Sequence, residues 1–180
     1  STEAGAKYLL IGAFSSALTL YGISLLYGLT GTLEISAIAA HGWGDSFSGV
    51  LFVAILFIIG GLGFKVAAVP FHMWVPDVYE GAPTPLTAFM SVAVKTAGFG
   101  ALARVLVVAL AVRPELWTDL LWLVAVLTMV VGNLLALKQD SVKRMLAYSS
   151  VAHTGYALIG LVALYGTDGG FASGSAAALL

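Results

Sequence analysis

The sequence has no cysteine and few charged residues, and both shortages restrict what the chain can be. Without cysteine, it cannot form disulfides, thiolate nucleophiles or cysteine-ligated metal and iron–sulfur centres. Only 9% of the 180 residues are charged and 60% are hydrophobic, whereas soluble domains contain about 25% charged residues. Too few polar groups are present to cover a water-facing surface, which excludes a water-soluble enzyme and a nucleic-acid-binding protein.

Long apolar runs occupy most of the chain and predict an all-α integral membrane protein built as a multi-span helical bundle. A helix needs about 20 apolar residues to cross the hydrocarbon of a bilayer. We expect one transmembrane domain with spans over residues 8–29, 47–79, 86–112, 116–137 and 142–164, and the start of another over 171–180. The last run is too short to cross, so we expect an interior piece of a longer membrane protein.

The basic residues predict the orientation of these spans. Lys7 precedes the first span, a basic cluster occupies residues 138–144, and the loop over residues 30–45 has no lysine or arginine. Because basic loops stay on the cytoplasmic side, we expect the N-terminal end there. The membrane is then a bacterial plasma membrane, with the mitochondrial inner membrane as the alternative.

The run over residues 47–79 is too long for one straight crossing and contains a proline. About 33 residues make a helix of about 50 Å, whereas the hydrocarbon is about 30 Å thick. Pro70 lacks a backbone donor and its ring clashes with the carbonyl of Val66. We therefore predict a discontinuous helix, broken near residues 66–70, with Pro70 as its hinge. Breaks of this kind occur at ion sites of transporters, and a kink filled by neighbouring side chains is the alternative.

Two lysines lie deep inside predicted spans, where a charge costs about 2.5–3.5 kcal/mol. Lys65 lies one turn before Pro70, and Lys95 lies in the following span. Because burial opposes the charged form of lysine, we predict that both residues transfer protons. For either lysine alone, the alternative is a side chain that extends to the headgroups. No predicted span has a deep acidic residue, so an acidic partner of Lys65 would come from elsewhere in the protein.

Two histidines are further candidates for proton transfer. His153 lies about 11 residues into the span over 142–164, and histidine titrates near neutral pH. Its alternative role is that of a hydrogen-bonded structural residue between helices. His72 follows Pro70 and is a candidate for lining the same polar cavity. We expect no metal site and no bound cofactor, because His41 has no partner at ligand spacing and the glycines near residue 60 lie inside a span.

Two sequence segments are similar to those of a known family. The segment FKVAAVPFHMWVPDVYEGAPTP over residues 64–85 and the segment DSVKRMLAYSSVAH over residues 140–153 resemble the antiporter-like subunits of proton-pumping NADH:quinone oxidoreductase, or respiratory complex I. The YEGAPTP and KTAGFG segments favour subunit N over its relatives L and M. The resemblance implies an inverted-repeat fold in which Lys65, Lys95 and His153 match positions of a polar axis. It also implies a glutamate upstream of Ser1 and a further lysine downstream of Leu180.

The resemblance further implies a role within a larger translocase. NADH, FMN, iron–sulfur clusters and quinone would be used by other subunits, and this chain would carry no redox centre. Its partners would be other membrane subunits, especially antiporter-like ones, and the lipid bilayer, with no nucleic acid. One alternative is a subunit of a multi-subunit cation/proton antiporter. Another is a structural membrane anchor without transport.

Overall fold

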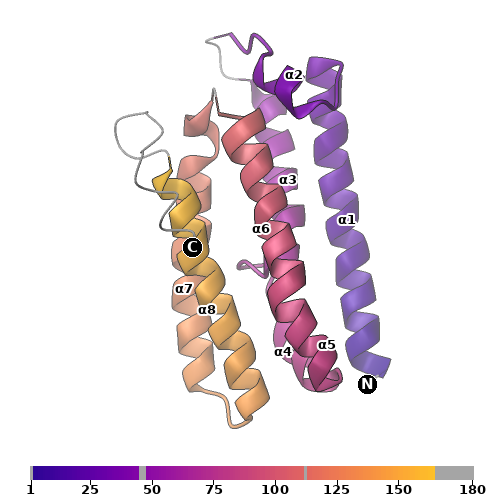
Figure 1. Cartoon of the computed structure of the whole chain (residues 1–180), viewed down its shortest axis with the longest axis vertical. Helices are drawn as coiled ribbons and strands as arrows, with labels where there is room; N and C mark the ends of the chain where they lie inside the picture. The colour runs from indigo at the N-terminus through magenta and orange to yellow at the C-terminus, as the bar shows by residue number, and fades with distance from the viewer. Residues whose placement is uncertain (1, 45–47, 112, 165–180) are drawn as a thin grey trace.

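The computed structural model describes residues 2–44, 48–111 and 113–164, and within these ranges every regular element is helical. The elements are α1 (Thr2–Thr30), α2 (Ile35–Ala39), α3 (Gly49–Val66), α4 (Trp74–Gly81), α5 (Thr84–Phe89), the π-helix η1 (Met90–Val94), α6 (Lys95–Ala103), the π-helix η2 (Arg104–Ala109), the 3₁₀ helix η3 (Pro114–Leu116), α7 (Thr118–Leu137) and α8 (Val142–Ala163). Among the described residues, five helical segments are long and apolar enough to cross a membrane: α1, α3, the continuous stretch Thr84–Ala109, α7 and α8. The predicted all-α, multi-span membrane fold is confirmed (Figure 1).

The first helix begins earlier than its apolar pattern indicates. α1 starts at Thr2, whereas the apolar run begins at residue 8. The turns before residue 8 are polar, so hydropathy does not include them in the helix. Glu3 and Lys7 form an ion pair of 2.8 Å at i,i+4 spacing, which supports an exposed turn. The predicted run over 171–180 lies outside the described residues, as do Phe47 and Val112, the predicted ends of two other spans.

The discontinuous helix is present, and its connection covers residues 67–73. α3 ends at Val66, four residues before Pro70, and Ala67 has a left-handed backbone with φ of 64°. The N–H of Ala68 donates to the carbonyl of Gly63 at 2.8 Å, and the N–H of Ala67 donates to the carbonyl of Phe64 at 3.1 Å. These bonds close the last turn of α3 as a left-handed cap does.

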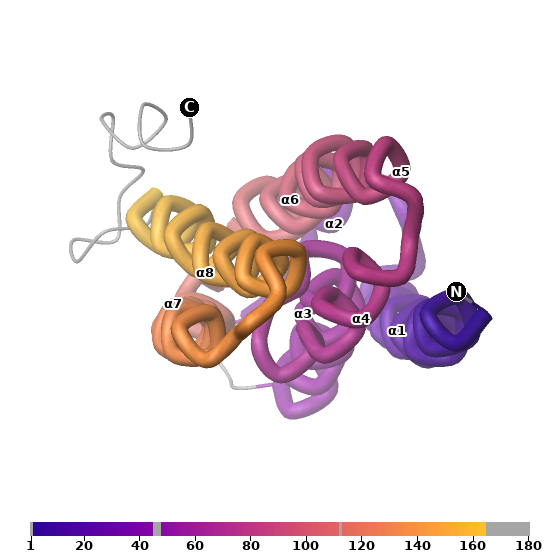
Figure 2. Tube along the Cα trace, turned by 90° about the horizontal axis from the view of Figure 1, so that it is seen from below, coloured from indigo at the N-terminus to yellow at the C-terminus, as the bar shows by residue number. Residues whose placement is uncertain are grey.

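The broken helix lies in the middle of the bundle. Seen along the helices, α3 and α4 lie between α1 on one side and α8 on the opposite side, and α6 lies along a third side (Figure 2). α7 pairs with α8, and α1 packs along α3. Small residues allow close backbone contact: a Cβ added at Gly61 would lie 2.7 Å from the carbonyl oxygen of Ser15, and one added at Gly132 would lie 2.7 Å from the backbone nitrogen of Ala152.

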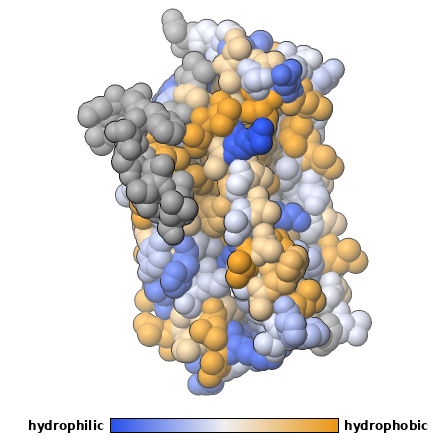
Figure 3. Space-filling model, in the orientation of Figure 1, coloured by the Kyte–Doolittle hydropathy of each residue, from blue (hydrophilic) through white to orange (hydrophobic). Residues whose placement is uncertain are grey.

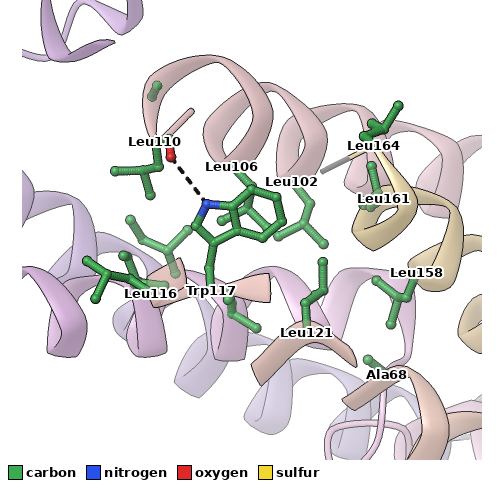
Figure 4. Packing of buried hydrophobic residues seen from close by; sticks show 14 of the residues in the cluster. Ala68, Leu102, Leu106, Leu110, Leu116, Trp117, Leu121, Leu158, Leu161 and Leu164 are labelled. Carbon is green, nitrogen blue, oxygen red and sulfur yellow. Dashed lines mark hydrogen bonds between the residues drawn. The ribbon is translucent and has the colours of Figure 1, made fainter. Parts of the chain in front are cut away.

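The apolar core surrounds Trp117, which is fully buried just before α7 (Figure 4). Its indole N–H donates to the carbonyl of Leu110 at 3.2 Å. Leu102, Leu106 and Leu121 lie near the ring in Figure 4, and Leu158 and Leu161 of α8 lie farther away in the same cluster. Large apolar side chains are also exposed along the outside, as at Leu9, Leu10 and Phe14 of α1. Orange surface extends along the bundle and blue occupies separate patches (Figure 3). Such a surface fits contact with lipid or with apolar protein.

Candidate functional site

Lys95 lies at the centre of a buried polar site. It is the first residue of α6, directly after the π-helix η1, and is only 7% exposed. Its Nζ donates to Ser150 Oγ at 2.6 Å, to the Ser150 carbonyl at 2.8 Å and to Thr154 Oγ1 at 3.2 Å. An ammonium has three N–H donors, so these three acceptors match its capacity. No carboxylate in the described part of the chain pairs with Lys95, and all three acceptors are neutral.

The sequence of α8 explains why two hydroxyls meet this lysine. Ser150 and Thr154 are four residues apart, which places them one turn apart on the same helix face. On the facing side, η1 winds more widely than an α-helix immediately before Lys95. Single π-turns of this kind are frequent at functional sites. The change of winding resets the face of the span from which Lys95 projects.

Thr154 also joins this site to the break in α3. Its hydroxyl donates to the carbonyl of Val66 at 2.7 Å. Val66 is the last residue of α3, and Pro70 has no N–H with which to continue the helix. The hydroxyl of Thr154 therefore donates to a carbonyl that, in an unbroken helix, would accept from the backbone N–H of residue 70.

Side chains also bond two further backbone groups at the break. The N–H of Val69 donates to Thr128 Oγ1 of α7 at 3.0 Å, and the indole of Trp74 donates to the carbonyl of Phe64 at 3.1 Å. Thr128 is completely buried. Backbone groups at membrane depth need partners within the protein, and α4, α7 and α8 each provide one here.

Lys65 lies in the last turn of α3 and is half-buried. Its Nζ is 5.6 Å from the centre of the Phe64 ring, close enough for a cation–π contact. Its Cβ packs against α6, because a Cβ added at Gly98 would lie 3.2 Å from it. Lys65 and Lys95 are thus on helices in contact, but no hydrogen bond joins them in the described residues.

The two histidines lie in different surroundings. His153 is exposed, and its Nδ1 lies 2.8 Å from the carbonyl of Ser149 in its own helix. It lines a cavity of about 420 Å³ together with Ser150 and Tyr79. Because Ser150 also accepts a hydrogen bond from Lys95, it borders both the lysine site and the cavity beside His153. His72 is buried in the break, with its ring 6.4 Å from that of Tyr148 on α8.

Ion pairs hold α4 at the end of the bundle where the N-terminus lies. Asp77 accepts from Lys7 of α1 at 2.7 Å and from Arg144 of α8 at 2.9 Å, and Arg144 also donates to Glu80 at 3.0 Å. The hydrogen bond from Arg144, with a further one from Ser141, lowers the pKa of Glu80. The pairs place α4, and with it one side of the break, between the first and last described spans.

The sequence reasoning did not identify the partners of Lys95 or those of the break. Ser150, Thr154 and Thr128 are not among the candidate residues named from the sequence. The i,i+4 spacing of Ser150 and Thr154 on one face of an apolar span was a usable signal. No comparable signal marks Thr128, whose partner Val69 is 59 residues away in sequence.

Fold and site together define a multi-span helical membrane protein with a broken central helix and a buried lysine beside the break. The chain belongs to the NADH:quinone oxidoreductase/Mrp antiporter transmembrane family, whose model matches residues 1–178. The resemblance noted in the sequence is thereby confirmed.

Relatives with known names match nearly the whole chain. It is 53% identical over 178 residues to NADH-quinone oxidoreductase subunit N of Trichlorobacter lovleyi, covering 98% of this chain and 34% of that protein. The subunit N of Myxococcus xanthus is 55% identical over 172 residues, covering 94% of this chain and 33% of that protein. The chain thus spans about a third of the length of these relatives.

Solved structures share the fold. A chain of respiratory complex I from Thermus thermophilus with bound aureothin superimposes with a TM-score of 0.74 and 45% identity, covering 88% of this chain and 34% of that chain. A chain of the Mrp complex from Dietzia has a TM-score of 0.79 and 27% identity, covering 89% of this chain and 29% of that one.

Proposed function

We propose that this chain forms part of a proton-translocating membrane subunit of an NADH:quinone oxidoreductase, and that Lys95 takes up and releases a proton. The observation that carries the proposal is the set of neutral oxygens around a lysine that is 7% exposed. Burial opposes the ammonium form, whereas the oxygen acceptors support it. A lysine held between these opposing effects, with no carboxylate paired to it in the described residues, can change its protonation state during a cycle.

The proton route that we propose includes Lys65, Lys95 and His153. Lys65 holds the proton at the broken end of α3, Lys95 receives it, and His153 passes it on. Support comes from Ser150, which contacts Lys95 and borders the cavity that His153 lines. The break around Pro70 gives water access to Lys65, and His72, buried in the same connection, is a secondary candidate on this route.

The chemistry of electron transfer lies outside this chain in our proposal. NADH, FMN, iron–sulfur clusters and quinone are used by other subunits, and this chain acts with them through the bilayer and through other antiporter-like membrane subunits. The named relatives are subunits of NADH-quinone oxidoreductases, which supports this assignment. The polar end with Lys7 and Arg144 faces the cytoplasm of a bacterium, by the positive-inside rule.

A second candidate function is that of a subunit of a multi-subunit cation/proton antiporter. The superposition on a chain of the Mrp complex from Dietzia favours it, although the identity is only 27%. The two functions differ in their energy source, because an antiporter subunit needs no NADH. Proton uptake that starts on addition of NADH would support the oxidoreductase, whereas uptake driven only by a cation gradient would support the antiporter.

The test uses the whole complex in everted membrane vesicles. Lys95→Met removes the titrating group, and we expect NADH-driven proton uptake to fall by roughly 100-fold, the lower end of the contribution of a positioned proton-transfer group. Lys138→Met is the matched control, because Lys138 is exposed beyond the end of α7, and it should pump normally. Unaltered uptake in Lys95→Met would refute the proposal, and unaltered uptake in Lys65→Ala would remove Lys65 from the route.

A further inference from the structure

The hydroxyl of Thr154 lies between Lys95 and the break in α3. Thr154 is 2% exposed, and its Oγ1 lies 2.7 Å from the Val66 carbonyl, 3.2 Å from the Ser150 carbonyl and 3.2 Å from Lys95 Nζ. A hydroxyl has a single hydrogen to donate. The shorter distance assigns that hydrogen to Val66 while Lys95 donates to the hydroxyl oxygen.

The protonation of Lys95 decides what this hydroxyl can do. A charged Lys95 has three N–H donors and no lone pair, so Thr154 can only accept from it. A neutral Lys95 has a lone pair and can itself accept a hydrogen bond. Ser150 Oγ, at 2.6 Å from Nζ, is the other hydroxyl that could donate to it. Of these two hydroxyls, that of Thr154 is the one bonded to α3 in the described residues.

We propose that Thr154 is a positioning residue that couples the charge of Lys95 to the break in α3. With Lys95 charged, the hydroxyl of Thr154 donates to Val66 and holds the end of α3 against α8. With Lys95 neutral, the hydroxyl turns toward Nζ and leaves the Val66 carbonyl free to accept from water. Loss of the proton from Lys95 thereby opens the break to water on the side of Lys65. This inference rests on the proposed function, because it requires Lys95 to change its charge.

Other titratable residues lie near this contact in the described part of the chain. They are Lys65, next to Val66 in α3, Tyr148 and His153, within one turn of Ser150 in α8, and Tyr79 of α4, which lines a cavity with Ser150. Within the described residues none of them hydrogen-bonds to Thr154, whose partners are Val66, Ser150 and Lys95. α7 contacts the break through Thr128, which is not titratable.

Three variants of the whole complex test the inference. Thr154→Val removes the hydroxyl at nearly constant volume, and Thr154→Ser keeps it. Thr128→Val is the matched control, because it removes the other buried threonine bonded to the break without touching Lys95. The readouts are the number of protons pumped per NADH and the pH at which pumping falls to half at the alkaline end.

In Thr154→Val we expect pumping per NADH to fall at least threefold. The alkaline midpoint should shift to lower pH by roughly half a unit. Both forms of Lys95 lose one hydrogen bond in this variant, but the bond to the charged form is the stronger one. Thr154→Ser should retain the wild-type midpoint. Thr128→Val should be less stable than wild type but keep the wild-type midpoint. The same result in Thr154→Val would indicate that Thr154 has a merely structural role.

The outcomes separate the inference from the proposed function. Normal pumping by Lys95→Met refutes both the proposed function and the inference. If Lys95→Met loses pumping but Thr154→Val keeps the wild-type midpoint and the wild-type number of protons per NADH, the inference alone is overturned. If Thr154→Val does not assemble, a second experiment uses the otherwise unaltered complex with ¹³C-labelled valine carbonyls. It records infrared difference spectra between high and low pH. A band that is absent in Val66→Leu identifies the Val66 carbonyl. Its shift with pH is expected, and its constancy would overturn the inference.

Discussion

Gly61 is the position where the packing of α1 on α3 is most sensitive to an added methyl group. In Gly61→Ala, the new Cβ would overlap Thr19 Oγ1 and lie 2.7 Å from the carbonyl oxygen of Ser15 and 2.9 Å from the backbone nitrogen of Thr19. Carbon–oxygen contacts normally begin near about 3.3 Å, so α1 must move away by about 0.6 Å or more. Overpacking of this kind costs about 1–3 kcal/mol.

The displacement also affects a hydrogen bond and the functional helix. Ser15 Oγ donates to the carbonyl of Gly61 at 2.7 Å, and bonds between membrane helices contribute about 0.6 kcal/mol each. The total expected loss of stability is thus about 2–4 kcal/mol. Because Lys65 follows Gly61 by one turn on α3, we also expect weaker proton pumping.

The assay is the thermal inactivation of the assembled complex in detergent. Gly100→Ala in α6 is the matched control, because a Cβ there meets nothing within 4 Å, and alanine favours helix by about 1 kcal/mol over glycine. Gly61→Ala should inactivate at a clearly lower temperature than Gly100→Ala. Equal inactivation temperatures would refute the close-packing argument for α1 and α3.

Two further predictions concern charge. Glu80→Gln should lower thermal stability at pH 7, and the difference from wild type should disappear as the pH falls below about 4. The pairing with Arg144 lowers the pKa of Glu80 and contributes stability only while Glu80 is ionised. A difference in stability that is independent of pH would contradict this prediction. Lys95→Met should change the free energy of unfolding by no more than about 1–2 kcal/mol. The cost of about 2.5–3.5 kcal/mol for a buried charge exceeds the total of three hydrogen bonds of about 0.6 kcal/mol each by only about that amount. Chemical denaturation measures this change, and a loss of stability above about 3 kcal/mol would contradict the prediction.

Composition and local pattern were sufficient to predict the membrane fold and the interrupted helix. The all-helical fold follows from apolar runs long enough to cross a bilayer, because in lipid the backbone must satisfy its own hydrogen bonds. The break follows from Pro70, whose missing N–H leaves the end of α3 open. α1, in contrast, begins at Thr2 because its first turns are helical and polar, which hydropathy alone does not reveal.

The details of the candidate site depended on tertiary contacts. A buried charge in a span identified Lys95 from sequence, but the hydroxyls around it come from α8, more than 50 residues later. The π-helix η1 before Lys95 has no recognisable sequence signature. Thr128 bonds Val69 only because α7 packs beside the break. Contacts between distant segments of this kind follow from the packed bundle and not from local pattern.

The most direct test of the account asks whether Lys95 moves a proton or only supplies a charge. Lys95→Arg keeps a cation and hydrogen-bond donors at the site, but a guanidinium does not release its proton in proteins. The number of protons pumped per NADH should be measured with this variant in the whole complex reconstituted into liposomes, with assembly checked by NADH oxidation. The account predicts that the ratio falls as far as in Lys95→Met. A wild-type ratio in Lys95→Arg would contradict it.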